Sequence, residues 1–102
     1  MKYQLVLQFP GNTEEHFEKL IKIEDKLEEK LQGISEVDGH DFGSNEMNIF
    51  ILTDEPIRTF EISKQIIENN NLCNVLKAAF RELHSNKYTI LWPKNLEEFI
   101  VK

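Results

Sequence analysis

The fold is decided by residues 34–53, which read ISEVDGHDFGSNEMNIFILT. Two runs suited to strands, 34–42 and 45–53, flank Gly43-Ser44, a pair suited to a tight turn with a positive φ at its first central residue. The pattern predicts a β-hairpin. The second run is apolar on both faces, with Met47, Ile49 and Ile51 on one and Phe50 and Leu52 on the other. Such a run is typical of a central strand.

The chain before the hairpin predicts a strand followed by a long helix. Residues 2–9 alternate polar with apolar side chains, as a half-buried strand does. Pro10-Gly11-Asn12 ends that strand, and Asn12 with Glu15 has the form of a helix N-cap with its reciprocal acid. Gly33 is placed to stop the helix. Apolar residues recur at helical spacing between them: Phe17, Leu20, Ile21, Leu27 and Leu31.

A second helix is expected to begin at Asp54-Glu55-Pro56, because proline is tolerated in a first turn and acids favour a helix N-terminus. The run Asn69-Asn70-Asn71 ends it, since asparagine readily adopts the left-handed conformation. Residues 72–83 fit either a helix or a strand, and the alternation of Leu76, Ala78 and Phe80 favours the strand. The choice decides how much sheet edge is exposed for pairing.

The last part of the chain predicts a strand and a short helix. Lys87 to Trp92 is extended, because it is rich in β-branched and aromatic residues and ends before Pro93. His84-Ser85-Asn86 forms the preceding turn. Asn95 caps a short C-terminal helix. Its packing residues are Leu96, Phe99 and Ile100.

This order of elements, β-α-β-β-α-β-β with a short C-terminal helix, describes one α+β domain over residues 1–102. We expect an antiparallel sheet of four to five strands with two helices on one face. The runs VDGHDFGSNEMNIFI and YTILWP resemble those of small, functionally uncharacterised bacterial proteins with a ferredoxin-like plait. The resemblance implies the two-layer plait and transfers neither an activity nor a site residue.

Composition excludes several classes of protein. Hydrophobic residues at 40% and charged residues at 29% fit a globular domain, and no apolar run is long enough to span a bilayer. The N-terminus lacks the pattern of a signal peptide, so we expect a cytoplasmic protein. With Cys73 as its single cysteine the chain forms no internal disulfide and no cysteine-cluster zinc site. Its net charge of −6 argues against nucleic acid as a partner.

The hairpin carries the strongest candidate chemistry. With Gly43-Ser44 as the turn, Asp41 lies opposite Glu46, and two opposed carboxylates share a cation, a proton or a basic partner group unless water screens them. His40 and Asp38 share a face and are candidates for acid and base or for metal binding. A metal needs further ligands, which neither His16 nor His84 has reason to supply. We therefore predict no metal and no cofactor.

Other signals are weaker. Cys73 lacks an adjacent base, so it is expected to be a small buried hydrophobe and not a nucleophile. The turn at residues 10–13 precedes Glu14 and Glu15, which would repel an anion at that helix N-terminus. The strand at residues 47–53 has none of the basic consensus of RNA-recognition modules.

The leading hypothesis is a non-enzymatic, acidic interaction module. The sheet face away from the helices needs a cover, which the last helix, a second copy, an apolar ligand or another protein would provide. We expect a homodimer or a basic protein partner, with an immunity or antitoxin-like role as one version. The predicted contact residues are Asp38, His40, Asp41, Glu46, Phe50 and Trp92. The alternatives are a small-molecule-binding or catalytic plait that uses His40 and Asp38, and a structural subunit of a larger assembly.

Overall fold

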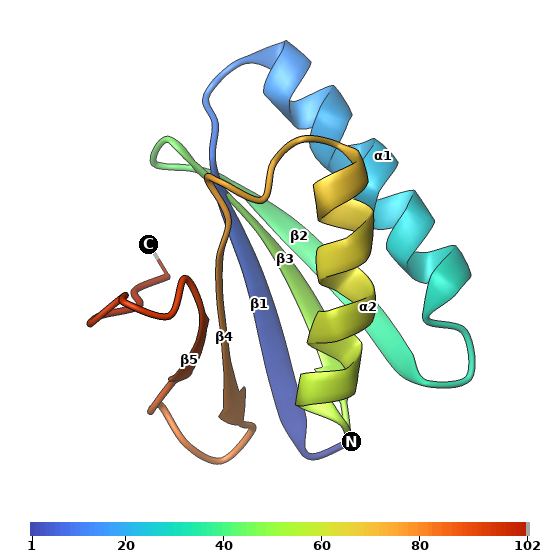
Figure 1. Ribbon diagram of the computed structural model, residues 1–102, viewed down its shortest axis with the longest axis vertical. Helices are drawn as coiled ribbons and strands as arrows, with labels where there is room; N and C mark the ends of the chain where they lie inside the picture. Colours follow the sequence, from blue (N-terminus) through green and yellow to red (C-terminus); the bar gives the residue numbers. More distant parts are fainter. Residues whose placement is uncertain (102) are drawn as a thin grey trace.

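The computed structural model describes residues 1–101, in which two helices pack on one face of a five-stranded antiparallel sheet (Figure 1). The elements are β1 (Tyr3–Pro10), α1 (Glu14–Lys30), β2 (Ser35–Gly43), β3 (Glu46–Thr53), α2 (Pro56–Asn69), β4 (Lys77–Glu82) and β5 (Thr89–Trp92). Across the sheet the order is β2-β3-β1-β4-β5, with every neighbouring pair antiparallel. The predicted α+β class is confirmed, and β3 is an interior strand as its two apolar faces indicated.

The main core lies between the sheet and the helices. Strand β1 runs through the middle of the sheet, and its residues Leu5, Leu7 and Phe9 face the helices with almost no exposed surface. Residues of β3, α1 and α2 complete this core, among them Ile49, Ile51, Leu20, Leu27 and Ile67. Val6, which lies between Leu5 and Leu7, points to the opposite face of the sheet and is also fully buried. Both faces of the central strand are therefore covered.

The helix boundaries follow from capping groups. Helix α1 is capped by Thr13, whose hydroxyl accepts a hydrogen bond from the His16 backbone N–H at 3.1 Å, so the predicted cap at Asn12 is wrong by one residue. Gly33 follows the helix with φ of +80°, in the left-handed region that glycine adopts without strain. Helix α2 begins at Pro56, and Asn71 after its end has φ of 59°.

The β2–β3 hairpin turns one residue later than the sequence suggested. Ser44 and Asn45 form the turn, with φ values of 53° and 63°, and Gly43 pairs with Glu46. Two central residues with positive φ match the twist of the flanking strands, and asparagine tolerates that conformation. The shift moves each partner by two residues, so Asp41 lies opposite Asn48 and not opposite Glu46.

The ambiguous stretch at residues 72–83 contains β4, as the favoured interpretation had it. The predicted C-terminal helix is wrong: residues 93–101 form no helix and cross the face of the sheet opposite α1 and α2 (Figure 1). Phe99 is buried there against Val6 and Ala79, and the Ile100 carbonyl accepts a hydrogen bond from Gln8. The C-terminal segment is therefore held on the sheet by apolar contacts and by this hydrogen bond, and not by the hydrogen bonds of a helix.

Within residues 1–101, no helix has the length and apolar character required to cross a membrane.

Candidate functional site

A β-bulge in β2 decides where the acidic residues of the hairpin lie. The pairing register with β3 shifts between Val37 and Gly39, which leaves Asp38 as the extra residue. Gly39 occupies the position opposite Phe50 with φ of +144°, which only glycine adopts readily. A Cβ built on Gly39 meets no atom within 4 Å, so the space over Gly39 is open. Phe50 beside it is partly exposed and packs on its other side against the cluster that contains Val6 and Phe99.

His40 lies on the helix side of the sheet and not on the opposite face. Its Nδ1 atom lies 3.0 and 3.1 Å from the two carboxylate oxygens of Glu24 on α1. Its ring packs edge-on against Phe17, with 5.6 Å between the ring centroids. Asp38, the acid that the sequence suggested as its partner, stands in the bulge on β2. The structure therefore pairs His40 with a carboxylate from another element.

The Glu24–His40 pair has the form of a carboxylate that orients an imidazole. Glu24 is 8% exposed, whereas 30% of the His40 side chain is accessible. A carboxylate bonded to Nδ1 fixes the tautomer and the plane of the ring. No group of three or more metal-ligating side chains occurs among residues 1–101. The observed contacts make the pair a link between β2 and α1.

The remaining predicted residues divide between two regions. Asp41 is exposed opposite Asn48, and Phe50 shares the same sheet face. Glu46 is the first residue of β3, directly after the hairpin turn. Trp92 instead packs toward α2: its indole N–H donates to the Cys73 carbonyl at 3.2 Å, and the Lys64 ammonium lies 3.8 Å from its ring centroid. The structure thus brings Asp41, Glu46 and Phe50 to one face and separates Trp92 and His40 from them.

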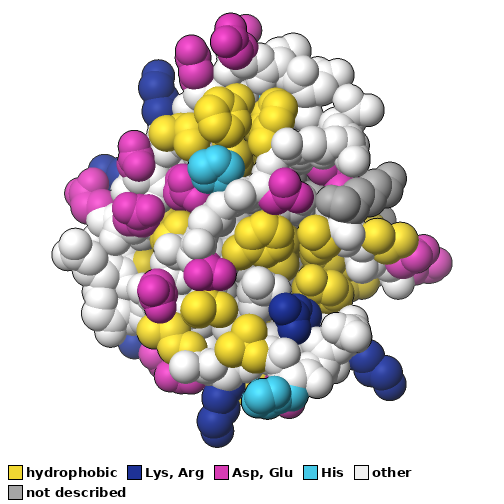
Figure 2. Space-filling model, turned by 180° about the vertical axis from the view of Figure 1, so that it is seen from behind, with side chains coloured by type: hydrophobic (Ala, Val, Ile, Leu, Met, Phe, Trp, Pro, Cys, Tyr) yellow, Lys and Arg dark blue, Asp and Glu magenta, His cyan; other side chains and the backbone are white. Residues whose placement is uncertain are grey.

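On that face an acidic and apolar surface remains beside the C-terminal segment. We call it the β2–β3 patch. Its residues are the partly exposed Phe50, Leu52 and Gly39 and the exposed Glu36, Asp38 and Asp41. Figure 2 shows hydrophobic side chains in the middle of this face and acidic side chains gathered on one side of them. The C-terminal segment covers the part of this face formed by β1 and β4. Within residues 1–101, it does not fully cover the part formed by β2 and β3.

Two buried amides attach the C-terminal segment to the sheet. Gln8 and Asn48 are 3% and 1% exposed, although Gln8 belongs to the polar side of the β1 alternation. Gln8 Nε2 donates to Asn48 Oδ1 at 3.0 Å and to the Ile100 carbonyl at 2.9 Å. Both N–H groups of the Gln8 amide are thereby used. Sequence reasoning missed this pair, because the alternation of residues 2–9 places Gln8 on the polar side of a half-buried strand.

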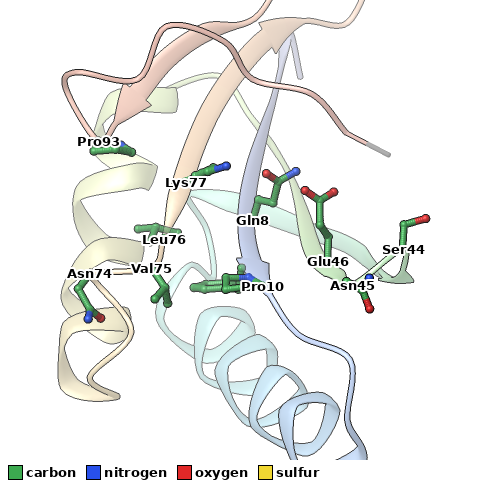
Figure 3. A pocket seen from close by; sticks show the side chains of 11 residues that line it. Gln8, Pro10, Ser44, Asn45, Glu46, Asn74, Val75, Leu76, Lys77 and Pro93 are labelled. Carbon is green, nitrogen blue, oxygen red and sulfur yellow. The ribbon is translucent and has the colours of Figure 1, made fainter.

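A cavity of about 540 Å³ opens at the end of the sheet where β1 and β4 diverge (Figure 3). Glu46, Gln8 and Lys77 line its polar side, while Val75 and Leu76 contribute apolar surface. The Oε1 atom of Glu46 is buried and has no hydrogen-bond partner. Sequence reasoning missed this cavity, because it depends on where the pairing of two strands stops.

Comparison with protein-family models, with curated proteins and with solved structures finds no match to this chain. The function is therefore argued from the geometry of the chain itself.

Proposed function

We propose that this protein is a non-enzymatic, cytoplasmic interaction module that binds a basic segment of another protein on the β2–β3 patch. The observation that carries the proposal is the open space over Gly39, next to the partly exposed Phe50. Gly39 supplies no side chain there, and the exposed carboxylates of Asp38 and Asp41 flank it. An aromatic anchor within a polar rim is a common arrangement of a protein-binding surface.

Charge favours a basic partner over a second copy of the chain. Each copy carries a net charge of −6, and the patch itself holds three exposed carboxylates, those of Glu36, Asp38 and Asp41. Two such surfaces face to face would place like charges together, which costs several kcal/mol at an interface. A basic segment gains attraction at the same positions and a faster association rate.

Binding occurs on the face of the sheet and not along its edge. Strand β2 is an edge strand, and its bulge at Asp38 interrupts the row of backbone groups that an added strand would pair with. The exposed charges of the same strand also oppose edge pairing. The partner segment therefore lies across the face of β2 and β3, and its apolar side chains pack on Phe50 and Leu52.

The strand order β2-β3-β1-β4, with a helix after β1 and another after β3, supports assignment to the ferredoxin-like plait, to which β5 is added. In that plait the face away from the helices is available for binding. An immunity or antitoxin-like role, in which an acidic domain neutralises a basic effector, is one form of the proposed function.

Selection of random peptides of about 12 residues displayed on phage tests the proposal. We expect the selected sequences to combine lysine or arginine with apolar residues. Their binding should weaken as salt rises and should be lost in Phe50→Ser and reduced in Asp41→Asn. Ile57→Ser and Asp25→Asn are matched controls, because both residues are exposed on helices.

Two results would overturn the proposal. One is selection of neutral or acidic peptides whose binding Phe50→Ser does not change. The other is a concentration-dependent dimer in sedimentation equilibrium that Phe50→Ser dissociates, since this would assign the patch to a second copy.

A further inference from the structure

The cavity at the end of β1 exists because two strands stop pairing there. The β1–β4 ladder ends at the pair Gln8–Lys77, and residues 74–76 lead away from the sheet. Pro10, two residues further along β1, has no N–H to extend a ladder toward β4. The gap is bounded on its far side by Pro93 (Figure 3). Its volume of about 540 Å³ lies within the range of small-molecule sites.

A carboxylate oxygen at the edge of this cavity has no hydrogen-bond donor. Glu46 Oε1 is shielded from solvent and has no partner. The neighbouring Gln8 cannot supply one, because its amide N–H groups already bond to Asn48 and to the Ile100 carbonyl. A buried carboxylate oxygen without a donor is costly, so the site favours a ligand that brings N–H groups. The Gln8 side-chain oxygen, which accepts no hydrogen bond within residues 1–101, adds a second acceptor.

The polar side of the cavity also carries a positive charge. Lys77 lines it, and the ion pairs of residues 1–101 include neither Lys77 nor Glu46. The two residues stand on β4 and β3 with β1 between them, Lys77 opposite Gln8 and Glu46 opposite Pro10, which puts their backbones about 12 Å apart. Figure 3 shows the Lys77 side chain directed toward Gln8 and the Glu46 carboxylate beside Gln8. A ligand between them meets a carboxylate and an ammonium group together.

We propose that this cavity binds a small zwitterion of the amino-acid class. The ligand ammonium donates to Glu46 and to the Gln8 oxygen, and the ligand carboxylate pairs with Lys77. An apolar side chain packs on Val75 and Leu76. A purely cationic ligand would be repelled by Lys77, and a purely anionic one by Glu46 and by Glu98 of the adjoining smaller cavity. Only a ligand with both charges satisfies both residues. The site is independent of the β2–β3 patch.

Titration of the full chain with L-leucine, followed by amide chemical shifts in NMR, tests the proposal up to about 10 mM ligand. We expect saturable shifts at Asn45, Glu46 and Lys77. Leucinamide, which lacks the carboxylate, and N-acetyl-leucine, which lacks the ammonium, should each bind about tenfold or more weakly. The same loss is expected for leucine with Glu46→Gln and with Lys77→Met.

Glu28→Gln and Lys87→Met remove exposed charges away from the cavity and should leave leucine binding unchanged. Circular dichroism of each variant checks that it is folded. The proposal is overturned if leucine causes no saturable shifts, or if leucinamide binds as tightly as leucine and Lys77→Met has no effect. The latter result would define an amine site in which Lys77 has no part.

Discussion

The Nδ1 atom of His40 lies 3.0 Å from Oε1 of Glu24, and this contact joins β2 to α1 across the covered face of the sheet. The carboxylate is almost buried, while the imidazole edge reaches solvent. A hydrogen bond in this position holds the edge strand β2 against the helix layer. It also fixes the bulged segment next to His40, which carries Gly39 and Asp38.

Removal of the carboxylate tests this link. Glu24→Ala deprives His40 of its partner and should lower the free energy of unfolding by about 1–3 kcal/mol. Glu28→Ala, at an exposed position of the same helix, should change it by less than about 0.5 kcal/mol. Urea denaturation measures both. Equal effects of the two substitutions would show that the Glu24–His40 contact contributes nothing to stability.

The amide of Gln8 is expected to hold the C-terminal segment on the sheet. Gln8→Ala leaves Asn48 Oδ1 and the Ile100 carbonyl without their donor, so unfolding should become easier by about 1–3 kcal/mol. Hydrogen exchange should accelerate in residues 96–101 more than in α1. Gln32→Ala, at an exposed position, is the control. Unchanged exchange in residues 96–101 would refute this role of Gln8.

Alanine substitutions at two glycines of β2 test whether the backbone conformation of the bulge requires glycine. A Cβ finds open space at both Gly39 and Gly43, but only Gly39 has a positive φ, of +144°. Gly39→Ala should therefore destabilise the protein by about 1–3 kcal/mol. Gly43→Ala should leave stability unchanged or raise it by less than about 1 kcal/mol. Thermal unfolding of the two variants compares them, and a stable Gly39→Ala protein would argue against the bulge.

A buried and an exposed isoleucine should differ in how much they contribute to stability. Ile49 is fully buried between sheet and helices, and Ile49→Ala should cost about 2–5 kcal/mol because it leaves a cavity. Ile57 is 51% exposed on α2, and Ile57→Ala should change stability by less than about 0.5 kcal/mol. Chemical denaturation distinguishes them. Similar losses would mean that the packing of β3 is misassigned.

Periodicity predicted most of the elements because burial on one side leaves a regular pattern. The alternation in residues 2–9 and the helical spacing in residues 17–31 correspond to β1 and α1. The turn was placed one residue early, since the sequence does not reveal that Ser44 and Asn45 both adopt positive φ. The C-terminal helix was wrong because Leu96 and Phe99 have helical spacing yet pack on the sheet from a segment without helix.

The candidate sites were less accessible to sequence reasoning. The acidic hairpin and Phe50 were identified, and the structure puts Asp41 and Phe50 on one face. The pairing of His40 with Glu24 was missed, because it joins residues of two elements whose relative rotation no periodicity specifies. The cavity at Glu46 was missed for a similar reason, since it depends on the register at which β4 leaves β1.

Photo-crosslinking tests the central claim, that a basic protein docks on the β2–β3 patch, most directly. A benzophenone amino acid is introduced at Leu52, within the patch, and separately at Ile57 on α2, and both proteins are irradiated in cells of the host organism. The proposed function predicts an adduct with a protein of net positive charge from position 52, lost when Asp41→Asn is added, and none from position 57. Adducts between two copies only, or the same adducts from both positions, would contradict it.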